Sequence, residues 1–260
     1  MQIPYKIISV FIDEKNGLRG NTTAVVKLER ALTEEHMQLI AEDFNQPATT
    51  YIWEEDGHFK VRWFAPDAEI GLCGHGAMGA IAFLGSADQE ELFFPAGSVY
   101  GQVVSQNTAK IWLQPIPTTK KLKKPEALIK GLGIEVLEYY KTDNKNIIVV
   151  ESEAALRKME PNFAVLRELE TFGYTVTAPG DDVDFVSRTL VPHVQQLEDP
   201  ATGSSHAALT PFWAERLKKD RLVARQLSKR GGAFVCEMAN EMVALEGQFK
   251  ILAEGTLNLS

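Results

Sequence analysis

Two stretches of this 260-residue chain follow the same plan, and that internal repeat constrains the fold more than any other feature. Residues 58–82, HFKVRWFAPDAEIGLCGHGAMGAIA, align without a gap with residues 184–208, DFVSRTLVPHVQQLEDPATGSSHAA, at an offset of 126. Four of the 25 positions are identical: Phe59 with Phe185, Arg62 with Arg188, Pro66 with Pro192, and Ala82 with Ala208. Each stretch contains a strand pattern, a proline, a titratable side chain seven residues later, a glycine-containing turn and an apolar helix. The alignment predicts two similar halves and sets Cys73 opposite Asp199, each as the last side chain before a helix.

The hydrophobic pattern predicts strands and helices in both halves. The expected strands are 3–12, 22–28, 48–54 and 58–65 in the first half, then 135–141, 146–152, 174–180, 183–190 and four closing strands between 222 and 255 in the second. The expected helices are 32–45, with Thr33 as its N-cap, the more apolar and therefore buried 74–85, and 202–217. Residues 114–130, with three prolines and five lysines, are expected to form a solvated connection between the halves. This pattern predicts an α+β fold.

Charge and composition limit the partners of the protein. A net charge of −8 and a pI near 5.3 disfavour nucleic acid and anionic membranes, because both require a basic surface. No apolar run approaches the length that spans a bilayer, and the charged N-terminal residues offer no signal peptide. Two cysteines, Cys73 and Cys236, provide no disulfide framework. We therefore expect a cytoplasmic protein.

The starts of the two apolar helices carry the most informative residues. A helix start presents unpaired backbone N–H groups and a partial positive charge, and glycine lets an anionic ligand approach them closely. The sequences CGHG at 73–76 and DPATGSS at 199–205 both fit this role. A thiol at a helix start has a lowered pKa, so Cys73 is a candidate base and Asp199 its counterpart. We expect both helix starts to bind one carboxylate-bearing molecule.

Each of these residues also has an ordinary structural interpretation. A single buried cysteine is most often a small core residue, His75 could be a capping group, and aspartate is favoured at N-caps. The shared register favours the functional interpretation, because one arrangement then explains the placement of Cys73, His75 and Asp199. Two rival sites are weaker. The glycines 74, 76 and 79 match a dinucleotide fingerprint in the wrong context, and Cys73, His75 and His206 match no standard zinc spacing.

Five segments resemble the signature segments of the PhzF-like phenazine-biosynthesis family, a branch of the diaminopimelate epimerase fold: GNTTAV, RWFAPDAEIGLCGHGAMG, DFVSRTLVP, EDPATGSSHAAL and QLSKRGG. The resemblance implies two pseudo-symmetric α+β domains, each a curled mixed sheet around a central helix. The expected domains are 1–116 and 117–248, and a last strand at about 249–260 is able to return to the first domain. The resemblance also implies that no cofactor or metal takes part, and the family often forms homodimers.

The resemblance assigns roles position by position. Asn21, Gly74, Gly76, Thr202, Gly203 and Ser204 match substrate-binding positions, and Cys73, His75 and Asp199 match positions of proton transfer. Cys73 matches one of the two epimerase cysteines, and in the repeat register Asp199 stands in place of the other. One position departs from the family: Ala48 occupies the place of the glutamate that serves as general acid and base of the phenazine isomerase. An alanine side chain cannot transfer a proton.

These observations predict a cofactor-independent isomerase or epimerase that moves a proton on a small carboxylate, by a reaction other than phenazine isomerisation. Cys73 with Asp199 is the favoured acid–base pair, and His75 with Asp199 is the second. The alternative from a different class is a protein on the same fold that binds a small acid, or a partner protein, without chemistry.

Overall fold

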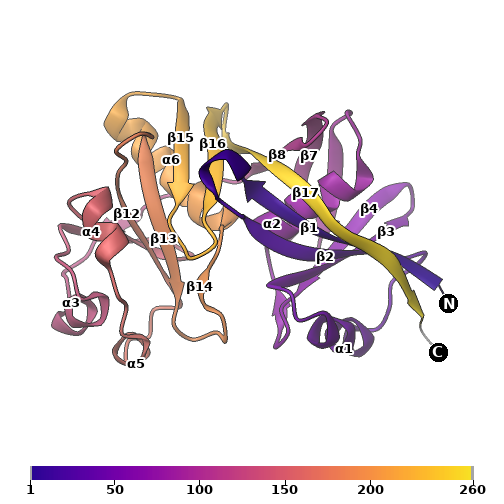
Figure 1. Cartoon of the computed structure of the whole chain (residues 1–260), viewed down its shortest axis with the longest axis horizontal. Helices are drawn as coiled ribbons and strands as arrows, with labels where there is room; N and C mark the ends of the chain where they lie inside the picture. The colour runs from indigo at the N-terminus through magenta and orange to yellow at the C-terminus, as the bar shows by residue number, and fades with distance from the viewer. Residues whose placement is uncertain (1, 259–260) are drawn as a thin grey trace. The chain divides into compact units, whose positions relative to one another are not determined.

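The computed structural model describes residues 2–258, and its chain divides into two compact units. Unit 1 contains the residues up to 113 and those from 246 onward, and unit 2 contains residues 114–245. One strand, β17 (Met242–Asn258), begins in unit 2 and continues through unit 1, where it runs antiparallel to β1 (Gln2–Ile12), as Figure 1 shows. Residues 259 and 260 of the expected last strand lie outside the described residues.

Unit 1 is a mixed sheet that curls around helix α2 (Gly74–Leu84). Its other elements are the 3₁₀ turn η1 (Glu14–Asn16), β2 (Asn21–Lys27), α1 (Glu34–Phe44), β3 (Ala48–Glu55), β4 (His58–Phe64), β5 (Glu69–Ile70), β6 (Glu90–Phe94), β7 (Gly97–Ser105) and β8 (Thr108–Leu113). Strand β1 pairs with β2, β2 with β3, β3 with β4, β4 with β6, β6 with β7 and β7 with β8. Strand β17 pairs with both β8 and β1. The pairings thus return the sheet to its starting strand.

Helix α2 is buried on all sides, as its apolar sequence predicts. Every residue from Gly74 to Ala82 is buried. Glycine permits this close packing, because a Cβ on Gly79 would lie 2.2 Å from the Thr23 side chain of β2. Helix α1 packs outside the sheet through Met37, Ile40 and Ala41, in a cluster with Tyr51 and Trp53 of β3. The predicted N-cap of α1 is confirmed, since the Thr33 hydroxyl accepts the His36 N–H.

Unit 2 repeats this plan with its own central helix, α6 (Gly203–Leu217). Its strands are β9 (Lys120–Lys121), β10 (Glu138–Lys141), β11 (Asn146–Val149), β12 (Tyr174–Pro179), β13 (Phe185–Val191), β14 (Leu197–Asp199), β15 (Arg221–Gln226) and β16 (Gly232–Ala239). Three short helices, α3 (Glu126–Leu132), α4 (Glu153–Lys158) and α5 (Phe163–Leu166), form a hydrophobic cluster with β12 and β13, and Figure 1 shows them together on one side of these strands.

Helix α6 contains a proline, and the carbonyl that this proline leaves without a helical donor still accepts a hydrogen bond. Pro211 has no N–H to donate to the carbonyl of Ala207, four residues earlier. The backbone N–H of Ile116 donates to that carbonyl instead, at 3.1 Å. The hydroxyl of Thr177 on β12 accepts a bond from the Trp213 indole, which fixes the helix against the sheet.

Two expectations about the elements were wrong in detail. The segment 114–130 is not only a connection, because β9 and most of α3 lie within it. The closing strands number three rather than four in the described part of the chain, since residues 242–258 form one continuous strand. Within residues 2–258 no helix is both long and apolar enough to cross a membrane.

The gapless repeat register is also wrong beyond the first strand of each stretch. In unit 1 the hairpin pairs Phe64 with Glu69, whereas in unit 2 it pairs Leu190 with Glu198. The second hairpin is therefore three residues longer, and the offset grows from 126 to 129. Thr202 is then the counterpart of Cys73, and Asp199 is the counterpart of Ile70.

A duplicated ion pair supports the corrected register. Arg62 binds Glu69 through two hydrogen bonds, each of 2.6 Å. Arg188 binds Glu198 in the same bidentate way, at 2.8 and 2.9 Å. The offset is 126 for the arginines and 129 for the glutamates, as the longer hairpin requires. Each pair holds the hairpin that leads into a central helix.

Candidate functional site

The start of α2 is capped by a thiol that also contacts an imidazole. Cys73 is the N-cap, and its Sγ accepts the Gly76 N–H at 3.3 Å. The same sulfur lies 3.3 Å from Nδ1 and 3.7 Å from Nε2 of His75. Both side chains are buried, at 4% and 6% exposure. The geometry gives the thiol a donor that stabilises its thiolate form and a neighbour that can take or supply its proton.

Gly76 lies where α2 packs against the sheet, and a side chain there has no room. A Cβ on Gly76 would lie 2.5 Å from the Trp63 ring and 2.8 Å from the Thr50 hydroxyl. Ala48 is fully buried two residues before Thr50 on β3, so it faces the same side of the sheet. Asn21 occupies the corresponding face of β2, two residues before Thr23. Both therefore lie on the side of the sheet where α2 packs.

The start of α6 has the same backbone geometry with different side-chain chemistry. The N-cap Thr202 has φ −118° and ψ 106°, close to the −123° and 99° of Cys73, but its side chain makes no capping bond. Its hydroxyl donates instead to Oδ2 of Asp199, at 2.7 Å. Asp199 ends strand β14 and is not itself the residue before the helix, which corrects the prediction. The structure does bring Asp199 and Thr202 together.

Ser204 and Ser205, the next two side chains of α6, are both hydrogen-bonded. Lys145, which is only 8% exposed, donates its Nζ to the Ser204 hydroxyl at 3.0 Å. Thr175 and Thr189 donate to the Ser205 hydroxyl at 2.8 and 3.0 Å. Helix geometry leaves the N–H groups of Gly203, Ser204 and Ser205 without acceptors inside α6, and no side chain caps them. The helix start can therefore bind an anion.

Two buried residues of unit 2 at this helix start were missed by the sequence analysis. Gln226, at the end of β15, accepts the Thr202 N–H and donates to both Asp199 and Thr202. Lys145 lies just before the expected strand 146–152 and was not singled out. The segment QLSKRGG drew attention to Gln226 only through the family resemblance, and a strand-end glutamine gives no further signal in a sequence.

His206 lies one turn inside α6 and is a structural residue. It is completely buried, stacked on Phe234 with ring centroids 3.6 Å apart, and its Nδ1 donates to the Thr202 carbonyl at 2.8 Å. Its Nε2 has no hydrogen-bond partner among the described residues. Burial lowers the pKa of His206 to about 4, so it is neutral at pH 7. No three His, Cys, Asp or Glu side chains within residues 2–258 form a cluster that could hold a metal ion.

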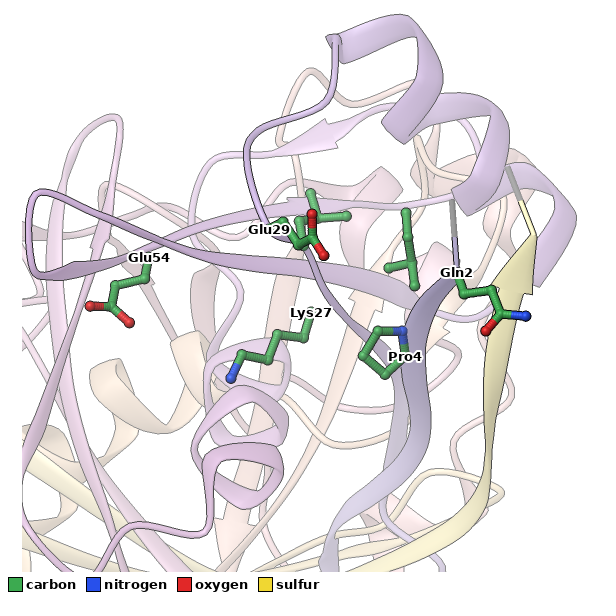
Figure 2. A pocket seen from close by; sticks show the side chains of 7 residues that line it. Gln2, Pro4, Lys27, Glu29 and Glu54 are labelled. Atoms are coloured by element: carbon green, nitrogen blue, oxygen red, sulfur yellow. The ribbon is translucent and has the colours of Figure 1, made fainter. Parts of the chain in front are cut away.

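A surface hollow elsewhere in unit 1 contains none of the expected site residues. It has a volume of about 500 Å³, and Figure 2 shows Gln2, Pro4, Lys27, Glu29 and Glu54 around it. Its charged side chains are exposed and come from the ends of β2 and β3 and the residues after β2. Solvated charges of both signs do not form a recognition site for a small acid.

Comparison with known proteins identifies relatives along the whole chain. The family model described as phenazine biosynthesis-like protein (PhzC-PhzF) matches residues 8–255. An uncharacterized isomerase of Pseudomonas aeruginosa is 33% identical over 262 residues, with 100% of both chains covered. Among solved structures, a PhzF-family phenazine biosynthesis protein of Enterococcus faecalis has a TM-score of 0.91 and 33% identity, again with 100% of both chains covered.

A more distant structure extends the likeness to epimerases. A hydroxyproline epimerase from Agrobacterium vitis, with bound trans-4-hydroxy-L-proline, has a TM-score of 0.66 at 8% identity. The match covers 98% of this chain and 92% of the epimerase. At that identity the likeness shows the fold alone. The predicted fold class, two α+β units of the epimerase type, is confirmed.

Proposed function

Since the chain belongs to the phenazine biosynthesis-like (PhzF) family, we propose that it is an isomerase or epimerase that transfers a proton on a small carboxylate. The observation that carries the proposal is the pair of helix starts with matching backbone geometry. Each helix start has N–H groups without acceptors inside the helix. Each also has a hydrogen-bonded titratable side chain: Cys73 accepts the Gly76 N–H in unit 1, and Asp199 accepts the Thr202 hydroxyl in unit 2. In this proposal Cys73 and Asp199 take part in the same reaction.

The chemistry follows from what these groups can do. A base removes the proton from the carbon beside the carboxylate, so the C–H bond breaks and an S–H or O–H bond forms. The electron pair left on carbon spreads into the carboxylate, which the N–H groups of Gly74, Gly203 and Ser204 hydrogen-bond. A second acid returns a proton to carbon. Cys73 and Asp199 fill these two roles, and His75 exchanges the thiol proton.

The proposal is tested by exchange in deuterated water. The protein is incubated with a panel of amino and hydroxy acids that includes trans-4-hydroxy-L-proline, the ligand of the Agrobacterium epimerase, and deuterium uptake beside the carboxyl group is followed by NMR. C73A and D199N are expected to abolish uptake, while T177V, which removes a buried hydroxyl of β12 beside Trp213 and away from the start of α6, retains it. Uptake that survives in both C73A and D199N contradicts the assignment.

A second candidate, an acid-binding protein without chemistry, is favoured by Ala48. The family places its catalytic glutamate at this position, and the alanine here is fully buried. A binder is expected to be stabilised against heat by small carboxylates, since a ligand that prefers the native state raises the unfolding temperature. A binder does not catalyse deuterium uptake into any of these carboxylates. Stabilisation without exchange over the whole panel therefore selects the binder.

A further inference from the structure

We propose that Gln226 is a positioning residue, which holds the Thr202 hydroxyl in the orientation that donates to Asp199 and thereby fixes the Asp199 carboxyl group for proton exchange with the substrate. The inference rests on the proposed function of Asp199 and deepens it. It assigns a role to a fully buried side chain at the end of β15, whose amide hydrogen-bonds Asp199 and Thr202.

The hydrogen bonds of the Gln226 amide have defined directions. Its Oε1 accepts the Thr202 N–H at 2.9 Å, so this end of the amide is the carbonyl. Its Nε2, which can only donate, then faces the Asp199 carbonyl at 2.5 Å and the Thr202 hydroxyl oxygen at 3.1 Å. One side chain therefore holds both the backbone and the hydroxyl of the residue that begins α6.

Two hydrogen bonds fix the orientation of the Thr202 hydroxyl. Its oxygen has two lone pairs and a single proton, and one lone pair accepts Nε2–H of Gln226. The proton is donated to Asp199 Oδ2, 2.7 Å away. This bond holds Oδ2 as an acceptor and fixes the orientation of the Asp199 carboxyl group. The Thr202 N–H is also taken up by Gln226, so the amides that bind a ligand begin at Gly203.

The N-cap residue of unit 1 makes a different hydrogen bond from the N-cap residue of unit 2. Cys73, the counterpart of Thr202, accepts the Gly76 N–H on its own sulfur and acts directly. Thr202 has the same backbone conformation, but its hydroxyl donates a hydrogen bond to Asp199, three residues earlier in the sequence. The acid–base group of unit 2 therefore lies outside the helix, and Gln226 and Thr202 connect it to the helix start.

The first experiment compares variants that remove single steps of this chain of hydrogen bonds. Q226E keeps an acceptor for the Thr202 N–H but loses both Nε2 donors, and T202V removes only the hydroxyl. Each is expected to lower kcat for deuterium exchange about tenfold or more, with KM within about twofold, because a positioned hydrogen bond is lost without a change in the amides that bind substrate. T202S is expected to restore kcat, and T177V serves as the control for loss of a buried hydroxyl in unit 2.

The second experiment does not depend on turnover. In ¹⁵N-labelled protein, the side-chain amide signals of Gln226 are expected to move as Asp199 titrates, and this movement is lost in T202V and D199N. Wild-type kcat in both Q226E and T202V, or Gln226 signals that stay fixed while Asp199 titrates, overturns the inference. A wild-type protein that exchanges no substrate overturns the proposed function instead, and the NMR titration still decides the role of Gln226.

Discussion

The neutral, buried state of His206 predicts a specific loss of stability in acid. Burial lowers its pKa from an ordinary 6.5 to about 4. Between these values the unfolded chain binds a proton that the folded chain does not, so the stability contribution is complete above pH 6.5 and is lost as the pH falls toward 4. At pH 4.5 the loss relative to pH 7.5 is about 2.5 kcal/mol, from roughly 1.4 kcal/mol per unit of pKa difference over nearly two units.

The assay is urea unfolding at pH 7.5 and 4.5 for the wild type and H206N. Asparagine does not titrate, and its amide can still donate to the Thr202 carbonyl, the partner of Nδ1. The wild type is expected to lose about 2.5 kcal/mol more than H206N between the two pH values. H193N, which changes an exposed histidine that also bonds a carbonyl, is the matched control and is expected to follow the wild type. Equal pH dependence of the wild type and H206N would refute the argument.

Three further predictions concern packing, thiol reactivity and the duplicated ion pair. G76A is expected to destabilise the protein by about 1–3 kcal/mol in urea unfolding, although alanine normally favours a helix, because its Cβ would meet the Trp63 ring. Iodoacetamide at pH 8 is expected to label Cys73 faster than Cys236, whose pKa burial raises to about 12; peptide mapping with C73A as control measures this, and equal rates contradict it. R188M is expected to cost about 2 kcal/mol or more, because Arg188 also donates to the Met159 carbonyl; a cost below 0.5 kcal/mol, the range of ordinary surface changes, contradicts this.

Much of the fold follows from local sequence signals. The hydrophobic pattern located the two central helices, and Thr33 marked the start of α1 because a hydroxyl there satisfies a backbone donor. The expected burial of α2 followed from its apolar residues on every face. These features depend on neighbours in sequence, which a single chain displays directly.

The wrong or missing predictions concern features that depend on contacts between residues far apart in the sequence. The gapless alignment matched strands β4 and β13 correctly at Arg62 and Arg188, but it could not detect that the second hairpin is three residues longer. Hairpin length is set by which residues pair, and the sequences between the equivalent pairs, APDA and VPHVQQL, carry no pairing signal. Gln226 was missed for the same reason, because its partner Thr202 lies 24 residues away.

The longer hairpin of unit 2 has a chemical consequence for the proposed reaction. In unit 1 the strand before the helix ends at Ile70, an apolar side chain, and the titratable group is the N-cap Cys73 itself. In unit 2 the corresponding strand ends at Asp199, and the N-cap is a threonine whose hydroxyl does not transfer protons readily at neutral pH. A carboxylate three residues before the cap needs a connection to the helix start, and Thr202 with Gln226 provides it. The two helix starts thus share their backbone conformation at the N-cap, and the proposed acid–base groups beside them differ in kind, a thiol and a carboxyl. Exchange of the two chemistries by T202C with D199N tests this directly: if the amides and their geometry are equivalent, the cysteine variant recovers deuterium exchange that D199N alone has lost.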